Sequence, residues 1–430
     1  MRSFFFLILF AIPVLVAGCG GSVSATSVSS STPASGASPS GSNVMAIAVN
    51  GGPTASYPNA AFASATICAP GSSTNCVTVN GLLVDTGSVG LRVLQSALGS
   101  LSLPAVNASN GSAAYDCVSF VDATYMWGPV LGADLTLGGE TASDLPIHVI
   151  SSSDAGVPSS CSEGGTAANT LASLGANGIL GVGTEPTDCF ADGTNVCAPG
   201  AVSSPLPVYY TCSGEACSPA YIATANEVAN PAVFFSADNN GVIVELPAVS
   251  GSAAAVTGSL VFGIGTESNN ALPGSDTVLT LTCGLFTTEF DGNSYGITNA
   301  NKCTGPGSFI DSGSNGLFFP DASIPSCPKN TEAGNLSDWY CPSSTENLSA
   351  TNYGANGASL STSFSVANAE TLFTSPSTEA DAALSQLGGV NPTGYGFDWG
   401  LPFFYGNNVY VSIDGQKMPS GAPAAPWWAY

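Results

Sequence analysis

Short apolar or alternating runs, separated by Gly, Asn and Pro, fill the chain beyond residue 43. Runs of this length with turn residues between them are typical of β-strands. Clear examples lie at residues 133–137, 241–246, 259–263 and 408–413. Helical periodicity is scarce; one segment that shows it is Glu379–Leu387, with Thr378 available as its N-cap and Gly388 as its stop. The pattern predicts an all-β fold with few helices.

The first residues have the pattern of an export signal and are set apart from the fold. Arg2 gives a positive start, an apolar stretch follows over Phe4–Val16, and the segment L-V-A-G-C ends at Cys19. This ending resembles the lipobox of bacterial lipoproteins, in which the signal is cut before a cysteine that is then acylated. An ordinary secretory signal is the alternative, and in either case the apolar stretch is too short to span a membrane. We expect residues 1–19 to be a lipoprotein signal peptide and Cys19 to anchor the exported protein to the cell envelope, at the outer membrane or cell surface.

Beyond the signal, the composition divides the chain into a tether and a body. Residues 20–43 carry no charge and consist mainly of Ser, Ala, Gly, Pro and Thr, so we expect a disordered tether. The remaining chain is too long for one hydrophobic core. We expect an N-terminal lobe at 44–265 and a C-terminal lobe at 266–430. The segment at about 184–230 has four cysteines and little periodicity, which predicts a disulfide-stapled insertion in the first lobe.

Acidic residues far outnumber basic ones, with 29 Asp and Glu against 5 Lys and Arg. So few bases cannot form a basic patch, which excludes nucleic acid as a partner. The same shortage limits the positive charge that the chain can acquire in acid, because protonated carboxyl groups are neutral. We therefore predict unusual tolerance of acid, which cooperative unfolding above about pH 5 would contradict.

The chain has 13 cysteines. Without Cys19 an even number remains, which in an exported chain indicates disulfides. Spacing alone does not fix their connectivity, so we pair neighbours in sequence and leave Cys117 with Cys161. The expected bonds are Cys68–Cys76, Cys117–Cys161, Cys189–Cys197, Cys212–Cys217, Cys283–Cys303 and Cys327–Cys341. A zinc site is disfavoured because there is one histidine and no C-x-x-C pair, and we expect no metal.

A short motif that begins with Asp occurs twice, each time behind an apolar run. The copies are D-T-G-S at Asp85–Ser88 and D-S-G-S at Asp311–Ser314, and each is followed at the same offset by Gly-Leu. A turn capped by the Asp side chain would explain a single copy. Phosphate-binding loops of sugar kinases and actin-like ATPases are another interpretation, but they need ATP and basic residues, which an exported chain so poor in bases lacks. Two copies with matching flanks favour a pair of catalytic carboxyl groups.

The two motifs resemble those of pepsin-like aspartic proteases, in which each of two lobes contributes one D-(T/S)-G-(S/T) loop. Each lobe of that family also has an apolar-apolar-Gly strand behind its loop, and residues 177–183 and 399–411 are similar to these strands. Residues 238–246 and 257–265 resemble the strands that bridge the lobes. The lipobox adds a similarity to an uncharacterised family of bacterial lipoproteins that carry two D-(T/S)-G-S motifs. The resemblance implies a bilobal, pepsin-like double β-barrel with an interlobe cleft.

The resemblance also implies a role for each residue of the two loops. Asp85 and Asp311 would be the catalytic pair, sharing one proton and activating a water molecule between them. The second loop residue would cross-brace the loops through its hydroxyl group, the glycine would donate its N–H to the carboxylate, and the serine would bond the outer carboxylate oxygen. These supporting residues are Thr86, Gly87, Ser88, Ser312, Gly313 and Ser314.

The chain departs from the family's pattern near both motifs. Asp398 stands where the family has an aliphatic residue, two positions before the glycine of the second threading strand. Arg92 stands where many members have tryptophan, and a cation beside the pair would lower carboxyl pKa values unless its side chain points away. Tyr125 and Trp127 are candidates for the aromatic residue of the flap that covers the substrate, with a core position as the alternative. His148 lies in an apolar run, and we expect a core or interlobe histidine there.

These observations predict an exported, lipid-anchored aspartic endopeptidase that cleaves extended polypeptides as a monomer, without metal or cofactor. The competing hypothesis is a catalytically inactive pepsin-like surface lipoprotein that binds peptide or protein partners. Two intact Asp motifs favour the enzyme, whereas Asp398 and Arg92 favour the binding protein. A glycosidase that uses the two acids is a weaker third hypothesis, because no aromatic sugar platform is evident.

Overall fold

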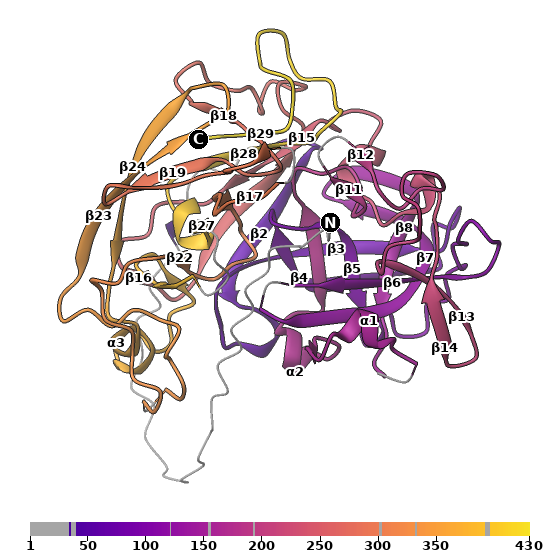
Figure 1. Cartoon of the computed structure of the whole chain (residues 1–430), viewed down its shortest axis with the longest axis horizontal. Coiled ribbons are helices and arrows are strands. Elements are labelled where there is room, and N and C mark those ends of the chain that lie inside the picture. Colours follow the sequence, from indigo (N-terminus) through magenta and orange to yellow (C-terminus); the bar gives the residue numbers. More distant parts are fainter. Residues whose placement is uncertain are drawn as a thin grey trace.

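The computed structural model of the protein describes residues 34–35 and 40–430, apart from 121, 154–155, 192–193, 301–302, 332 and 392–395. Strands dominate it and its helices are short, so the all-β prediction is confirmed. Figure 1 shows two halves: the indigo to magenta strands of the first half of the chain gather on one side, and the orange to yellow elements on the other. No helix in the described part of the chain is long and apolar enough to cross a membrane.

One sheet of 17 strands forms most of the N-terminal half and continues into the C-terminal half. The four segments predicted from their apolar pattern fall in β7, β15, β17 and β28 of this sheet, and these predictions are confirmed. In chain order the strands are β1 (Ala34–Ser35), β2 (Val44–Gly51), β3 (Tyr57–Cys68), β4 (Cys76–Asp85), β5 (Val89–Leu94), β6 (Ala114–Ser119), β7 (Thr124–Leu137), β8 (Glu140–Ile150), β9 (Thr166–Ala167), β10 (Gly178–Val182), β13 (Tyr209–Ser213), β14 (Ala216–Pro219), β15 (Gly241–Glu245), β17 (Val256–Phe262), β18 (Val278–Thr280), β28 (Asn408–Ser412) and β29 (Trp427–Ala429).

Smaller sheets and short helices complete the fold. One four-stranded sheet has the order β20-β19-β23-β24 and another β21-β27-β22-β26, while β11 pairs with β12 and β16 with β25. These strands are β11 (Phe190–Ala191), β12 (Thr194–Asn195), β16 (Ser252–Ala253), β19 (Thr287–Phe290), β20 (Asn293–Tyr295), β21 (Phe309–Ile310), β22 (Leu317–Phe319), β23 (Glu346–Tyr353), β24 (Ser359–Val366), β25 (Ala383–Leu384), β26 (Gly388–Val390) and β27 (Asp398–Trp399). The helices are α1 (Ser159–Ser162), α2 (Leu171–Leu174) and α3 (Ala369–Thr374), with 3-10 turns η1 (Gly52–Thr54), η2 (Gln95–Leu98), η3 (Thr224–Asn226), η4 (Pro231–Phe234) and η6 (Leu401–Phe404).

The two halves are joined by backbone pairing and by a buried asparagine. Strand β15 pairs with β17 on one side and with β28 on the other, and β17 also pairs with β2. Asn59, in β3, donates from Nδ2 to the carbonyl oxygens of Asn315 (3.0 Å) and Leu384 (2.8 Å), and it accepts the Leu384 N–H at 2.7 Å. These contacts fix the N-terminal half against the segment that follows the second Asp motif.

The two halves repeat one arrangement of four strands. In the first, β10 pairs parallel to β4 and antiparallel to β5, and β5 pairs parallel to β8. In the second, β27 pairs parallel to β21 and antiparallel to β22, and β22 pairs parallel to β26. The threading strands β10 and β27 run so close to their neighbours that a Cβ at Gly181 would lie 2.6 Å from the carbonyl carbon of Val89, and one at Gly400 2.1 Å from the oxygen of Gly316. This close approach explains why an apolar pair followed by glycine marks the first threading strand in the sequence.

The helix predicted for Glu379–Leu387 is wrong. Part of the segment forms β25, which pairs antiparallel with β16, and Leu384 is held by Asn59 as described above. Tertiary pairing thus outweighs the local helical preference of these residues. The observed helix α3 lies earlier in the chain and is capped by Asn368, whose side chain accepts the Thr371 N–H at 3.0 Å.

The disulfides match the sequence prediction, whereas the predicted tether is described only in part. All six expected disulfides are present. The signal segment, Cys19 and most of the predicted tether lie outside the described residues. Within the predicted tether, however, β1 pairs in parallel with β17, and Asn43 is buried and donates to the carbonyl oxygen of Phe262 at 2.9 Å. Contacts with the body therefore begin before the expected boundary at residue 44.

Candidate active site

The two motif aspartates occupy equivalent places at the centre of the molecule. Asp85 is the last residue of β4, and Asp311 directly follows β21. Both side chains are fully buried, and each carboxyl group acts on the pKa of the other. Two buried carboxyl groups that interact in this way do not readily ionise together, because each negative charge opposes the other. This arrangement favours a state in which the pair holds one proton.

The second residue of each loop ties the two loops together. Thr86 Oγ1 accepts the Ser312 N–H at 2.9 Å and donates to the carbonyl oxygen of Ile310 at 3.3 Å. Reciprocally, Ser312 Oγ accepts the Thr86 N–H at 3.1 Å and donates to the carbonyl oxygen of Val84 at 2.8 Å. All four bonds are buried, so each hydroxyl group satisfies a backbone donor and a backbone acceptor of the other half. This reciprocal brace fixes the separation of the two aspartates.

The remaining loop residues support the carboxyl groups. In each loop the glycine N–H donates to Oδ1 of the aspartate, over 2.8 Å from Gly87 and 2.7 Å from Gly313. The serine hydroxyl group meets Oδ2 of the same aspartate, from Ser88 in the first loop and over 2.8 Å from Ser314 in the second. The structure thus brings all eight motif residues into one cluster.

The environments of the two carboxyl groups differ. Burial raises the pKa of Asp85, but hydrogen bonds from Asp311, Ser88 and Gly87 oppose the rise. Burial also raises the pKa of Asp311, and there the negative charge of Asp85 adds to the rise, so it lies well above its usual range. These effects favour a proton on Asp311 and a negative charge on Asp85.

Asp398, the acid that departs from the family's pattern, joins this cluster. It lies at the start of β27, is fully buried, and its Oδ2 is 2.7 Å from the hydroxyl oxygen of Ser314. Ser314 therefore lies between the carboxyl groups of Asp311 and Asp398. The site contains three acids, two of which the motif repeat identifies.

Most of the chain matches a protein family. A family model described as "Protein of unknown function (DUF3443)" matches residues 39–430. The chain belongs to this family. No curated protein matches it. Among solved structures, the aspartic proteinase from Irpex lacteus is similar at 15% sequence identity, over 86% of this chain and 94% of that protein, with a TM-score of 0.44. This similarity is too low to assign a chemistry to the site, which must be argued from the residues of the DUF3443 chain itself.

A tyrosine that the sequence analysis missed lies near the pair in this DUF3443 protein. Tyr57 begins β3, is buried, and packs its ring against Gly175. Burial, followed by the negative charges of Asp122, Asp311 and Asp85, raises the pKa of its hydroxyl group well above the usual range. Among the described residues this hydroxyl group has no hydrogen-bond partner. Tyr57 belongs to no motif, and no sequence pattern marks it.

The two flap candidates lie in β7 and belong to a packed cluster. Trp127 stacks on Tyr115 with 5.4 Å between ring centroids, and its edge meets Tyr210 at 5.2 Å. Tyr125 is buried in the same cluster, beside the Cys117–Cys161 disulfide. These contacts match the core position that was the alternative to a flap.

The interlobe cleft expected from the resemblance is not open at the aspartates. Both carboxyl groups are fully buried, because each is surrounded by its own loop and by the loop of the other half. Tyr57 is also buried near them. A ligand that reaches the pair must therefore displace part of this enclosure.

Arg92 is engaged in a buried charge network of its own. Its Nη1 bonds Asp116 and lies 2.8 Å from His148 Nδ1, while its Nη2 bonds Asp188 at 3.0 Å. Tyr209 donates to the other oxygen of Asp188 at 2.5 Å. Asp188 and Tyr209 come from the cysteine-rich segment predicted as an insertion, so that segment supplies a counter-charge to Arg92. His148 is a fully buried core histidine, and burial lowers its pKa to about 4.

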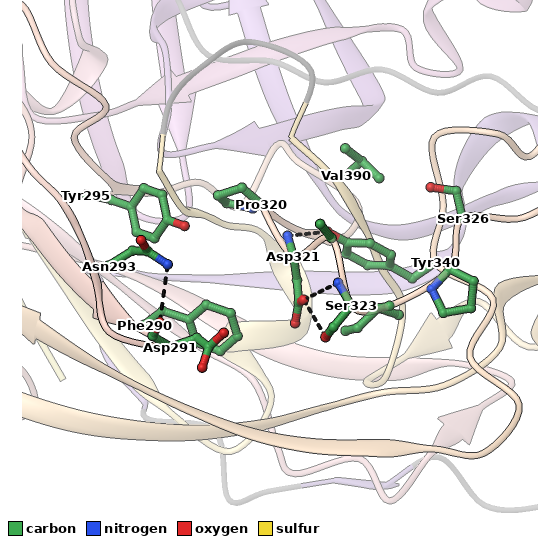
Figure 2. A pocket seen from close by; sticks show the side chains of 13 residues that line it. Phe290, Asp291, Asn293, Tyr295, Pro320, Asp321, Ser323, Ser326, Tyr340 and Val390 are labelled. Atoms are coloured by element: carbon green, nitrogen blue, oxygen red, sulfur yellow. Dashed lines mark hydrogen bonds between the residues drawn. The ribbon is translucent and has the colours of Figure 1, made fainter.

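A surface pocket of about 700 Å³ lies elsewhere in the C-terminal half (Figure 2). Its lining includes Tyr295, Asp321 and Tyr340 but no residue of the two Asp loops. Figure 2 shows that Asp321 is hydrogen-bonded to other residues of the pocket lining: its N–H donates to Tyr340 Oη at 2.9 Å and its Oδ1 accepts the Ser323 N–H at 2.8 Å. Among the described residues, no group of three or more His, Cys, Asp or Glu is placed to hold a metal ion. The paired carboxyl groups remain the site with distinctive chemistry.

Proposed function

We propose that this DUF3443 protein is an aspartic endopeptidase that hydrolyses extended polypeptides with the Asp85–Asp311 pair. The observation that carries the proposal is the reciprocal hydroxyl brace that joins the two equivalent loops and holds two buried carboxyl groups where each acts on the pKa of the other. A structural turn needs neither the second carboxyl group nor the brace. Two acids that share one proton can supply a base and an acid to the same substrate.

The proposed reaction uses the two carboxyl groups in opposite protonation states. The Asp85 carboxylate accepts a proton from a water molecule as the water oxygen adds to the carbonyl carbon of the scissile peptide bond. Asp311 donates its proton to the carbonyl oxygen, which gives a neutral tetrahedral diol. One diol hydroxyl group then returns its proton to Asp311 as the carbonyl re-forms, the proton on Asp85 passes to the peptide nitrogen, and the C–N bond breaks. The pair ends in its starting protonation state.

Tyr57 is a further candidate for this reaction. Its unpartnered hydroxyl group is near the pair and can donate a hydrogen bond to a substrate carbonyl or to the tetrahedral intermediate. The role that we predicted for Tyr125 or Trp127 in a flap would then fall to a residue of another strand. Substrate entry would require Tyr57 to move, since the pair is enclosed.

The full burial of the pair favours a second candidate function. A catalytically inactive protein that keeps this fold and binds peptide or protein partners needs no access to the two carboxyl groups. Asp398 supports this candidate as well, because a third buried acid beside Asp311 is absent from the pattern of the active family that the motifs resemble. The two candidates make opposite predictions for cleavage.

The deciding experiment measures cleavage of an unfolded protein substrate between about pH 3 and 8, with and without a statine-type inhibitor. The variants are Asp85→Asn and Asp311→Asn. Asp144→Asn is the matched control, because Asp144 is exposed at positive φ, which asparagine tolerates. We expect acid-range cleavage that both dyad variants abolish and the control retains. Equal cleavage by all four proteins would disprove the dyad, and cleavage by none of them would favour the binding protein.

The cellular setting extends the proposal. Six disulfides indicate an oxidising compartment. We propose that the protein is exported and held at the outer membrane or cell surface by a lipid on Cys19, that it acts there as a monomer, and that the lobes are divided near residue 265. The chain's acidity supports polypeptide rather than nucleic acid as its partner.

A further inference from the structure

Ser314 cannot donate to both of its carboxyl neighbours. Its hydroxyl oxygen lies 2.8 Å from Asp311 Oδ2 and 2.7 Å from Asp398 Oδ2. A serine hydroxyl group has one proton to donate and two lone pairs with which to accept. If both contacts are hydrogen bonds, one of the two carboxyl groups must itself be protonated and donate to Ser314. The geometry therefore requires a proton in addition to the donation from the hydroxyl group.

The surroundings assign that proton to Asp398. Among the described residues the only hydrogen-bond partner of the Asp398 side chain is Ser314, and its Oδ1 has none. Asp311, in contrast, also accepts the Gly313 N–H and interacts with Asp85. The ionisable groups that act on Asp398 and Asp311 are acids, including Asp85, whose charge adds to burial in raising the pKa of Asp398. An unpaired carboxylate in this position would have neither solvent nor a cation to stabilise it.

The first half of the molecule lacks this third acid. Ile179 in β10 pairs with Leu83 of β4, and Asp398 in β27 pairs with Phe309 of β21, each at the second position before the glycine of its threading strand. The two loops therefore differ in one respect: Ser88 has an aliphatic residue at the equivalent place, whereas Ser314 has a carboxyl group. The extra carboxyl group therefore adjoins the Asp311 loop and has no counterpart at the Asp85 loop.

We propose that Asp398 is a protonated positioning residue that commits the hydroxyl proton of Ser314 to Asp311. This inference rests on the proposed function, in which Asp311 is the acid of the pair. With Asp398 protonated, the chain of donors runs from Asp398 to Ser314 and from Ser314 to Asp311. When Asp398 ionises, Ser314 turns to the new carboxylate, and Asp311 loses a donor and gains a negative neighbour. Both changes make Asp311 a weaker acid, so its proton is harder to give to a substrate carbonyl, and the pair works as proposed only below the pH at which Asp398 loses its proton.

The test compares the wild type with Asp398→Asn and Asp398→Ile. Asparagine keeps a neutral donor to Ser314 and cannot ionise. Isoleucine reproduces the aliphatic residue at the equivalent place in the first half of the molecule. Either variant that folds therefore removes the titration of residue 398. The first measurement is the number of protons that the native state binds in excess of the unfolded state, obtained from the pH dependence of urea unfolding. Above the pKa of an unfolded aspartate, we expect the wild type to bind one proton more than either variant.

The second measurement is the alkaline limb of log kcat/KM against pH. We expect two protons to be lost in the wild type and one in Asp398→Asn. Equal proton counts in all three proteins would show an ionised Asp398 and overturn the inference, whether or not the protein cleaves. A one-proton difference with identical pH profiles would overturn the positioning role. A wild type that never cleaves would refute the proposed function, and the proton count would still decide where the proton lies.

Discussion

The single histidine of the chain offers a stability prediction whose size follows from the structure. His148 Nδ1 lies 2.8 Å from Arg92 Nη1. Because an arginine only donates, Nδ1 accepts and the imidazole is neutral, with its proton on Nε2. Protonating Nδ1 would remove this acceptor and place a second positive charge beside the guanidinium group. Burial is the largest cause of the lowered pKa, Asp116 opposes it, and Arg92 adds to it, with the result that the pKa is about 4 instead of 6.5.

The lowered pKa makes His148 destabilising in acid. Between pH 6.5 and 4 the unfolded chain binds a proton at His148 and the native state does not, so the free energy of unfolding falls as the pH falls. At about 1.4 kcal/mol for each pH unit between these values, the loss is roughly 3 kcal/mol. His148→Gln removes the titration, and we expect its stability relative to the wild type to improve by this amount between neutral pH and pH 4.

Urea unfolding of both proteins at intervals of pH provides the measurement. The difference between the two free energies of unfolding isolates His148, because both proteins share every other titrating group. At neutral pH the variant is expected to be less stable, since Arg92 loses an acceptor. A difference that does not change with pH would refute a neutral buried histidine beside Arg92.

Buried carboxyl groups act in the opposite direction. The pKa values of Asp311 and Asp398 are raised well above their usual range, in each case chiefly by burial. Their contribution to stability is complete below the pKa of an unfolded aspartate and is lost as the pH rises through the raised values. This effect agrees with the acid tolerance predicted from composition, and His148 is the group that limits it.

Three further outcomes are expected. Ser312→Ala leaves the Thr86 N–H and the Val84 carbonyl without their buried partner. The free energy of unfolding, measured by urea titration, should therefore fall by about 2–4 kcal/mol. A loss below the error of the titration would contradict the brace. Tyr57→Phe should lower kcat/KM about 100-fold, because one hydrogen-bond donor to the transition state is lost. Its free energy of unfolding should stay equal or rise, because an unpartnered hydroxyl group is removed. Unchanged kinetics would exclude Tyr57 from the reaction. Cys19→Ser should move the protein from the detergent phase to the aqueous phase of a membrane extract, and an unchanged distribution would exclude the lipid anchor.

The fold class and the central pair could be predicted because their signals are local and repeated. Strands such as β15 and β28 have apolar runs of typical length between turn residues, and six disulfides connect cysteines that are neighbours in sequence or left over from such pairs. The motif repeat singled out Asp85 and Asp311 because the two halves of the fold require the same loop twice. The glycine after an apolar pair reflects a backbone contact that permits no side chain at Gly181.

The rest depends on contacts between distant segments, which no local pattern records. The segment predicted as a helix pairs with β16 instead, since Asn59 holds its backbone from far away in the chain. Tyr57, at the start of β3, is acted on by the charges of Asp311 and Asp85, and nothing in its own stretch of sequence marks it. The sequence showed Asp398 as an exception to a pattern; only the structure shows that Ser314 connects it to Asp311.

The central claim is that Asp85 and Asp311 share one hydrogen. Neutron diffraction from crystals grown in heavy water under mildly acidic conditions observes that atom directly. The account predicts one deuterium between the two carboxyl groups, bonded to Asp311. Two bare carboxylates, or side chains too far apart for a hydrogen bond, would contradict it.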